Sequence, residues 1–286
     1  MMQSATARLR LLLVPAIAVL AIAFIVPVLL FFAQALHSFA QGKVSADWTL
    51  ATFITFVTDP FHLATLLNSA ILSGMVTGIT LVMAYPVALM MSNWRGSLLF
   101  AILALIVFSP VLVSIIVRAY GWQLLLANDG VVNFLMQRLG LVARPVRLMF
   151  NWTGVVISIV HVELPFMMFP ILTVLLQLPR SLTEAARDLG AGEFAAWRRV
   201  TLPLSVPGVL AGCQIVFTTA ISAFASPTIL GGGRVRVMPV TIYQNIIGLN
   251  WPMAAVQSML LLACSLLLVT VFSRLLSVRR WQPQAA

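Results

Sequence analysis

Two ionisable side chains lie close together in an otherwise apolar stretch of this 286-residue chain. His161 precedes Glu163 by two residues, and Pro165 follows Glu163 at the same distance. An ionisable group in hydrocarbon costs at least ~2.5 kcal/mol, so it usually faces a polar cavity or a partner. A carboxylate that lines a pathway would favour a cationic solute. The alternatives are that Glu163 pairs with an arginine such as Arg118, or that it lies nearer the membrane interface.

A second polar series follows further along the chain, again among apolar residues. Thr218 and Thr219 are adjacent, and Ser222 follows Thr218 by four residues, which is about one helical turn. Ser226 lies four residues further on. Such hydroxyl groups either line a channel or form hydrogen bonds between helices. The candidate pathway residues are therefore His161, Glu163, Thr218, Thr219 and Ser222.

Residue patterns for catalysis or metal binding are scarce. The chain has three histidines, and neither HExxH nor GxSxG occurs, nor does the phosphate-binding pattern GxxxxGK followed by Ser or Thr. Cys213 and Cys264 lie inside apolar runs without a CxxC or a Cys/His cluster, which is typical of buried small side chains. We therefore expect no catalytic residues, no metal site and no cofactor in this chain.

Membrane helices must position these residues. Hydrophobic residues make up 61% of the chain and charged residues 8%, whereas a soluble domain carries about a quarter charged residues. Apolar runs of ~20 residues cross a bilayer as helices, and continuous rather than alternating runs exclude a barrel. The net charge of +10 comes from arginines dispersed near helix ends, which favours contact with lipid headgroups and argues against nucleic acid. The sequence thus predicts an all-α polytopic membrane protein.

Six transmembrane helices are expected within a single domain, residues 1–286. We also expect a cytoplasmic loop over residues 179–206, and an external segment over residues 119–151 that carries one or two short helices on the membrane surface. The expected spans are residues 11–36, 63–91, 98–117, 152–178, 207–230 and 253–274.

The distribution of basic residues orients these spans. An even number of spans places both termini on one side of the membrane. If that side is the cytoplasm, ten of the 17 lysines and arginines lie inside and seven outside, as the positive-inside rule favours. The apolar run after Arg8 and Arg10 exceeds the roughly 7–15 residues of a signal sequence, so we expect an uncleaved first span.

One compact polar segment, EAARDLGAGEFAAWRRVTLP, interrupts the apolar pattern between the fourth and fifth spans. Ser181 and Glu184 have the spacing of a capping box, which predicts a helix from Leu182. Gly190 then supplies the left-handed residue that commonly ends a helix. A second short helix is expected over residues 193–200.

Two further features of this segment bear on its role. Pro203 and Pro207 are expected to break the second helix before the fifth span begins. The first helix carries an apolar face that needs a cover, and either a soluble partner or lipid headgroups would supply one. That face consists of Leu182, Ala185, Ala186 and Leu189.

The same segment resembles the EAA loop of permease subunits of binding-protein-dependent ABC importers. That signature is Glu-Ala-Ala, three residues, Gly, nine residues, an aliphatic residue, any residue, and Leu-Pro. The matching positions here are Glu184, Ala185, Ala186, Gly190, Val200, Leu202 and Pro203, with Val in place of the commoner Ile.

The resemblance extends over most of the chain. In its wider sequence the chain is similar to the spermidine/putrescine-type permeases. The resemblance includes SPVLVSIIVRAYGWQLLLANDGVVNFLMQRLGL, then SAFASPTILGGGRVRVMPVTIYQNI with NWPMAAVQSMLLL. It implies a MetI-like permease fold in the bacterial inner membrane and a polyamine or similar small cationic solute. The same permease class carrying an opine, an amino acid or an aminophosphonate stays open, and an ion-coupled secondary transporter would leave the polar segment unexplained.

The resemblance also implies partners. Two permease subunits would form the pathway, and the resemblance to the polyamine branch implies that they are different chains. An ABC ATPase dimer binds ATP at the cytoplasmic face, and a periplasmic or lipid-anchored receptor delivers the solute. The ATPase-coupling residues would be Glu184, Ala185, Ala186, Arg187, Asp188, Gly190, Leu202 and Pro203.

Overall fold

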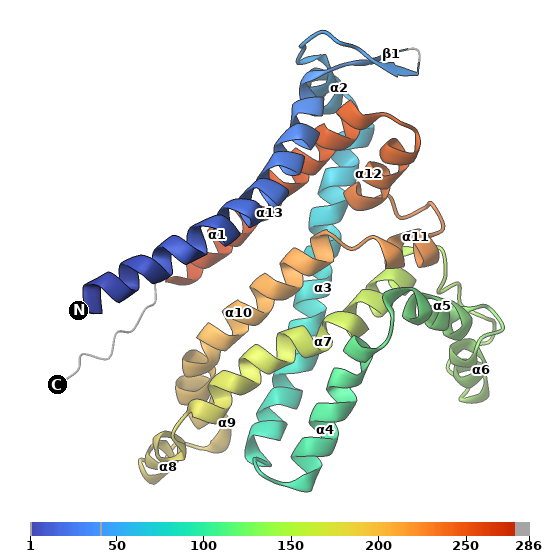
Figure 1. Cartoon of the computed structure of the whole chain (residues 1–286). Coiled ribbons are helices and arrows are strands. Elements are labelled where there is room, and N and C mark those ends of the chain that lie inside the picture. Colours follow the sequence, from blue (N-terminus) through green and yellow to red (C-terminus); the bar gives the residue numbers. More distant parts are fainter. Residues whose placement is uncertain (1, 41, 278–286) are drawn as a thin grey trace. The chain divides into compact units, whose positions relative to one another are not determined.

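The protein is almost entirely helical in its computed structural model, which describes residues 2–40 and 42–277 (Figure 1). The helices in chain order are α1 (Met2–Ala33), η1 (Gln34–Leu36), α2 (Ala51–Thr58), α3 (Pro60–Asn93), α4 (Leu98–Phe108), η2 (Ser109–Leu112), α5 (Ile115–Leu126), α6 (Val131–Arg138), α7 (Trp152–Gln177), α8 (Arg180–Asp188), α9 (Glu193–Ala196), η3 (Trp197–Thr201), α10 (Leu202–Ile221), α11 (Ala225–Gly231), α12 (Met238–Ile247) and α13 (Trp251–Ser277). A two-stranded antiparallel ribbon pairs β1 (Phe39–Ala40) with β2 (Lys43–Val44). The expected all-α fold class is confirmed.

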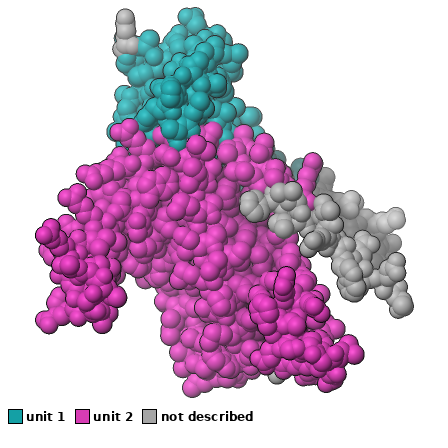
Figure 2. Space-filling view, turned by 180° about the vertical axis from the view of Figure 1, so that it is seen from behind, with its two compact units in different colours: residues 1–64, 241–262 teal, residues 65–240, 263–286 magenta. Residues whose placement is uncertain are grey.

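The chain divides into two compact units (Figure 2). Unit 1 comprises Met1–Ala64 and Thr241–Leu262, and unit 2 comprises Thr65–Val240 and Ala263–Ala286. Every candidate residue named above for the pathway or for coupling belongs to unit 2.

Helices long and apolar enough to cross a membrane agree with most of the expected spans. Within residues 2–40 and 42–277, five such segments are found, and a bent pair makes a sixth if it is one span. Four of the expected spans coincide with these segments, and most of their ends agree to within a few residues. The third and fifth expected spans differ from the structure. The five segments are Ala18–Leu36, Pro60–Asn93, Trp152–Gln177, Glu193–Ile221 and Trp251–Val271.

The third expected span, residues 98–117, is not one straight helix. α4 passes into η2 and stops at Leu112, and the helical segment that starts at Ile115 is turned by 102°. Pro110 lies within η2, where it has no backbone N–H to continue the α-helical ladder. Arg118 donates a hydrogen bond to the Pro110 carbonyl and so fastens the bend from the α5 side.

The fifth expected span, residues 207–230, is also shifted. The helix runs without interruption from Glu193 to Ile221, so the prediction that prolines would break it was wrong. η3 is a π-helical turn directly before Pro203, and such a turn shifts the helical hydrogen-bond pattern at the place where proline lacks a backbone N–H. α10 ends one residue before Ser222, whose hydroxyl bonds back to carbonyls of the last turn.

The core of unit 2 forms where α7 packs lengthwise against α10 (Figure 1). Two glycines of α10 let the two backbones approach closely. A Cβ added to Gly208 would lie 2.7 Å from the Pro170 carbonyl oxygen, and one added to Gly212 would lie 2.8 Å from the Met167 sulfur. Buried side chains of α3, including Leu72 and Val76, complete this core.

Unit 1 is held by a polar network among its helix ends. The buried amide of Gln257 hydrogen-bonds to His62 Nδ1 at 3.2 Å and accepts a bond from Asn245 at 3.0 Å. Phe56 stacks on the His62 ring with centroids 5.5 Å apart. These contacts join α2, α3, α12 and α13 within the unit.

Candidate functional site

The polar segment after α7 forms a short helix between two longer ones. α8 begins at Arg180, directly after Pro179, whose backbone is extended (φ −63°, ψ 128°). Ser181 therefore lies inside the first turn and makes no capping bond, so the expected capping box was wrong. The proline sets the helix start because its fixed φ suits an N-terminal boundary.

The end of α8 is a Schellman motif built on Gly190, as the sequence predicted. Gly190 has φ +84°. Its N–H donates to the Arg187 carbonyl at 2.8 Å, and the Ala191 N–H donates to the Ala186 carbonyl at 3.0 Å. This pair of bonds satisfies two carbonyls that a helix end leaves open. A Cβ added to Gly190 would meet nothing within 4 Å, so the backbone conformation alone requires glycine there.

The apolar face of α8 is uncovered in this chain. Leu182 is 44% exposed and Leu189 is 90% exposed. Ala185 between them is exposed and Ala186 is half-buried. Because large exposed apolar side chains beside charged ones mark contact surfaces, the face has the properties of a docking element.

A pocket of about 770 Å³ lies beside α8. Its walls come from the end of α3, the end of α7, α8 and η3, and it includes Arg95, Glu184 and Trp197. Arg187 Nη2 lies 3.3 Å from Glu193 Oε1 and ties α8 to the start of α9. The structure brings Glu184 and Arg187 to this pocket.

The remaining coupling candidates are distributed along the same connection. Ala185, Ala186 and Asp188 lie on α8 outside the pocket lining. Leu202 and Pro203 form the first turn of α10, where the Leu202 carbonyl accepts a bond from the Ser205 hydroxyl. The second polar helix, expected as a separate element over residues 193–200, is instead continuous with α10.

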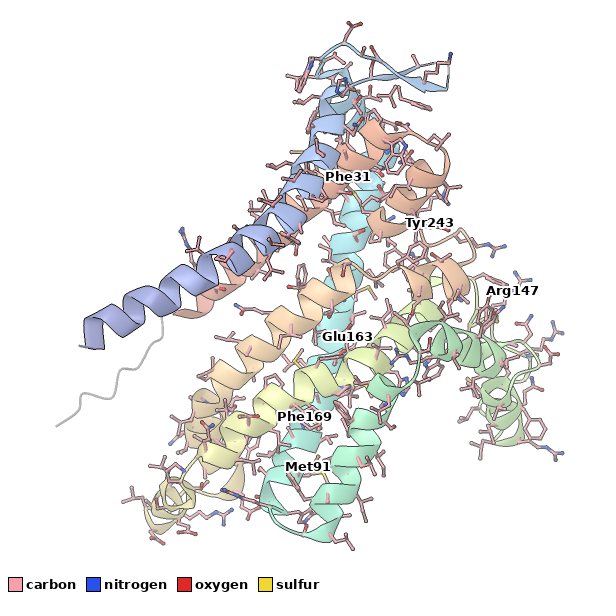
Figure 3. All side chains as sticks on the ribbon, in the orientation of Figure 1. Phe31, Met91, Arg147, Glu163, Phe169 and Tyr243 are labelled. Carbon is pink, nitrogen blue, oxygen red and sulfur yellow. The ribbon has the colours of Figure 1, made fainter. Side chains whose placement is uncertain are left out.

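A second group of candidates lies deeper in unit 2, between α7 and α10. Glu163 is only 5% exposed and accepts a 2.7 Å hydrogen bond from the Thr219 hydroxyl. Figure 3 shows Glu163 midway along α7, above Phe169. Arg118 and Glu163 are both described by the structure and form no ion pair with each other. The carboxylate is therefore joined to α10 by the Thr219 hydroxyl group.

His161 is not part of that contact. Its Nδ1 accepts a 3.2 Å hydrogen bond from Trp122 Nε1, and the two rings meet edge to face with centroids 5.4 Å apart. Residues two apart on a helix point about 200° from each other, so His161 faces α5 while Glu163 faces α10. The structure thus separates two candidates that the sequence places together, and it adds Trp122 to the site.

An exposed polar stripe continues along α10. Thr218 bonds back to the Gln214 carbonyl at 2.8 Å, and Ser222 bonds back to the Thr219 carbonyl at 3.0 Å. Gln214 also donates to the Ser273 hydroxyl of α13 at 2.6 Å. Sequence reasoning missed Gln214, although its spacing of four residues before Thr218 and eight before Ser222 marks the same helix face.

Comparison with known proteins places this arrangement in context. Residues 74–281 match the family described as "Binding-protein-dependent transport system inner membrane component". The chain is 34% identical over 221 residues to the spermidine/putrescine transport system permease protein PotB of Haemophilus influenzae, which covers 76% of each chain.

Two solved structures share the fold at 20% sequence identity. One is a bacterial ABC transporter involved in the import of the acidic polysaccharide alginate, with a TM-score of 0.81 and 97% coverage of both chains. The other is a bacterial alginate ABC transporter in complex with an alginate pentasaccharide-bound periplasmic protein, with a TM-score of 0.79 and coverage of 99% of this chain and 98% of that one.

Proposed function

Because this chain belongs to the family of binding-protein-dependent transport system inner membrane components and is the permease subunit of an ABC importer, we propose that it carries a polyamine and takes its driving force through α8. The proposed cargo class is spermidine, putrescine or a similar small cation. The relative from Haemophilus influenzae, at 34% identity, is named for these two amines.

The buried carboxylate supports a cationic cargo. Glu163 accepts a bond from the Thr219 hydroxyl and, within the described chain, has no arginine or lysine as an ion-pair partner. Arg118 acts on Glu163 electrostatically but lies outside ion-pair distance, which leaves the carboxylate able to contact a passing ammonium group. Thr218, Thr219 and Ser222 on the α10 stripe would offer hydroxyl groups to the same solute, whereas His161 faces α5 and is held by Trp122.

Coupling to the ATPase is assigned to α8. Only two residues separate α7 from α8, and only residues 189–192 separate α8 from the continuous helix that becomes α10. A displacement of α8 by a partner would therefore pull on both α7 and α10, which pack on each other through their glycine contacts. The apolar face of α8 would seat in the ATPase, with Glu184, Arg187 and Asp188 as its polar rim.

The partner set and orientation follow from this assignment. Both termini and α8 would lie in the cytoplasm, where an ABC ATPase dimer binds and hydrolyses ATP, so that this chain needs no cofactor and carries out no catalysis itself. A second permease of different sequence would complete the pathway. A periplasmic or lipid-anchored receptor would dock at the opposite side.

The observation that carries the proposal is the exposed α8 face held between two short joints. The test is to purify the chain with its co-purifying subunits, reconstitute them in liposomes, and measure uptake of labelled spermidine with and without ATP. We expect uptake only with ATP, the ATPase and a receptor. Uptake by this chain alone, driven by an ion gradient, would overturn the proposal, and ATP-driven uptake of another solute but not spermidine would overturn its cargo.

A further inference from the structure

Four exposed arginines gather at the end of unit 2 that lies at the start of α7. Arg138 ends α6, Arg144 and Arg147 lie in the connection to α7, and Arg234 lies in the turn after α11. We call these four residues the arginine face. Asp129 is the only carboxylate in residues 115–151 and 225–237, and none of the four arginines forms an ion pair within the described chain.

Hydrogen bonds and one close packing contact hold the segments of the arginine face together. The buried Asn133 side chain of α6 bonds to both the N–H and the carbonyl of Val146, at 2.8 and 3.0 Å. The Phe150 N–H donates to the Leu230 carbonyl at 2.8 Å. A Cβ on Gly232 would lie 2.2 Å from the Phe150 ring, so the turn that carries Arg234 packs directly on this connection.

The guanidinium groups are held at the surface. Arg138 lies over the Phe134 ring, with its guanidinium carbon 5.4 Å from the ring centroid. Figure 3 shows Arg147 beyond the end of α7 nearest α5 and α6, far along α7 from the α8 end. Four positive charges that have no ion-pair partner in the described chain therefore lie on the segments around the start of α7.

The charge of this face is opposite to what the proposed cargo would need. A polycation approaching from bulk solvent would be repelled by four arginines, so the face does not serve to attract free polyamine. The basic residues also lie on the side that the positive-inside rule leaves poor in lysine and arginine. An anionic partner that hands over the cargo would account for both facts.

Resting on the proposed function, we infer that the arginine face is the docking surface for an acidic face of the solute receptor. Complementary charge would steer and orient the receptor, while repelling cargo that has not been delivered by it. Since rim charges act chiefly on association, the effect belongs to receptor affinity rather than to the transport cycle itself.

The test measures receptor-stimulated ATP hydrolysis by the complete complex in nanodiscs, as a function of the concentration of the purified receptor. Arg144→Gln, Arg147→Gln and Arg234→Gln should each raise the half-saturating receptor concentration by about two- to fivefold. The triple variant should raise it about tenfold or more, because separate charges add. Hydrolysis without receptor should stay unchanged, and higher salt should shrink the differences.

A substitution of opposite sign gives a control that loss of folding cannot imitate. Asp129→Asn removes the single carboxylate beside the face and should lower the half-saturating receptor concentration. Lys43→Gln removes an exposed charge on the β1–β2 ribbon of unit 1, outside the face, and should change it by less than about 1.5-fold.

Three outcomes overturn the inference. The first is an unchanged half-saturating concentration in the triple variant. The second is an effect seen in nanodiscs that contain phosphatidylglycerol but absent in phosphatidylcholine alone, which assigns the face to lipid headgroups. The third is a wild-type complex that no receptor stimulates, which overturns the proposed function as well; the first two leave that function intact.

Discussion

At the scale of single residues, the site depends on one partly buried hydrogen bond. Thr219 donates to Glu163 at 2.7 Å, while its hydroxyl also lies 2.9 Å from the Ile215 carbonyl of its own helix. A hydroxyl has one proton to donate, so the bond to the carboxylate and the helical back-bond compete. Charge-assisted hydrogen bonds are the stronger kind, which favours the bond to Glu163.

Removing the charge of Glu163 tests the cationic cargo. Glu163→Gln keeps the side-chain volume and the acceptor for Thr219 but leaves no negative charge for an ammonium group. Because a hydrogen bond to a charged group contributes about 1.5–3 kcal/mol, we expect spermidine uptake, as kcat/KM, to fall about tenfold or more. Transport at the wild-type rate by an equally abundant variant would remove the main support for a cationic solute.

The neighbouring threonines provide a matched pair. Thr219→Val is close to isosteric and leaves the Glu163 carboxylate without its donor, which costs about 1–3 kcal/mol in a buried site. Thr218→Val removes a hydroxyl that bonds only to a carbonyl of its own helix. Thermal unfolding of the purified complex should show a clearly larger loss for Thr219→Val. Equal losses would mean that the bond between α7 and α10 adds no stability.

At the scale of elements, the structure differs from expectation in two places. The helix is continuous where prolines were expected to break it before α10, and it is bent where residues 98–117 were expected to form one straight span. The prolines of α10 follow a π-helical turn and do not end the helix, whereas the α4 to α5 connection turns by 102° after a proline. Between α7 and α10, α8 is held by two short joints. The joint at Gly190 is the one position there with a positive φ.

The Gly190 joint is predicted to couple ATP hydrolysis to uptake. Gly190→Val places a β-branched residue at φ +84°, where L residues lose about 1–2 kcal/mol or more, and should misdirect α8. We expect normal membrane insertion but ATP hydrolysis that no longer drives uptake in liposomes. Gly192→Val is the control, since Gly192 has φ −64° and open space around its Cβ. Wild-type uptake in Gly190→Val would count against coupling through α8.

The packing of α7 on α10 makes a separate prediction. Gly212→Ala would place a methyl group 2.8–2.9 Å from the Met167 sulfur and carbonyl oxygen, and such overpacking costs about 1–3 kcal/mol. The melting temperature of the purified complex should fall. Gly78→Ala in α3 meets nothing within 4 Å and should leave it unchanged or raise it slightly. A similar response of both variants would argue against close α7–α10 contact.

At the scale of the whole molecule, the proposed function requires α8 and the arginine face to lie on opposite sides of the membrane. They lie at opposite ends of α7, a 26-residue helix that is long enough to cross a bilayer. Force from the ATPase would thus enter unit 2 at one end of α7 and the receptor would dock at the other.

Cysteine labelling tests this orientation. After Cys213 and Cys264 are replaced by Ala, Arg144→Cys should react with a membrane-impermeant maleimide in intact spheroplasts. Ser181→Cys, exposed at the start of α8, should react only in inverted vesicles. The reverse pattern would place α8 outside and contradict its contact with a cytoplasmic ATPase.

Local pattern was enough to anticipate much of this protein. Run length and composition predicted the membrane helices, and the ends of α7 and α13 agree to within a few residues because hydrophobicity acts within each segment. Gly190 was identified as the helix stop because a positive φ is a property of one residue and its neighbours. The spacing from Glu184 to Pro203 indicated the family that the comparison confirms.

The local sequence pattern did not predict the contacts between segments that are distant along the chain. Nothing near Glu163 indicates that its partner is Thr219, 56 residues later, or that Trp122 holds His161 from α5. The π-helical turn before Pro203 and the bend at Pro110 likewise depend on what surrounds each proline. Hydrophobic periodicity reports which residues avoid water, whereas the choice among buried partners is made by how whole helices pack, and that is settled only in three dimensions.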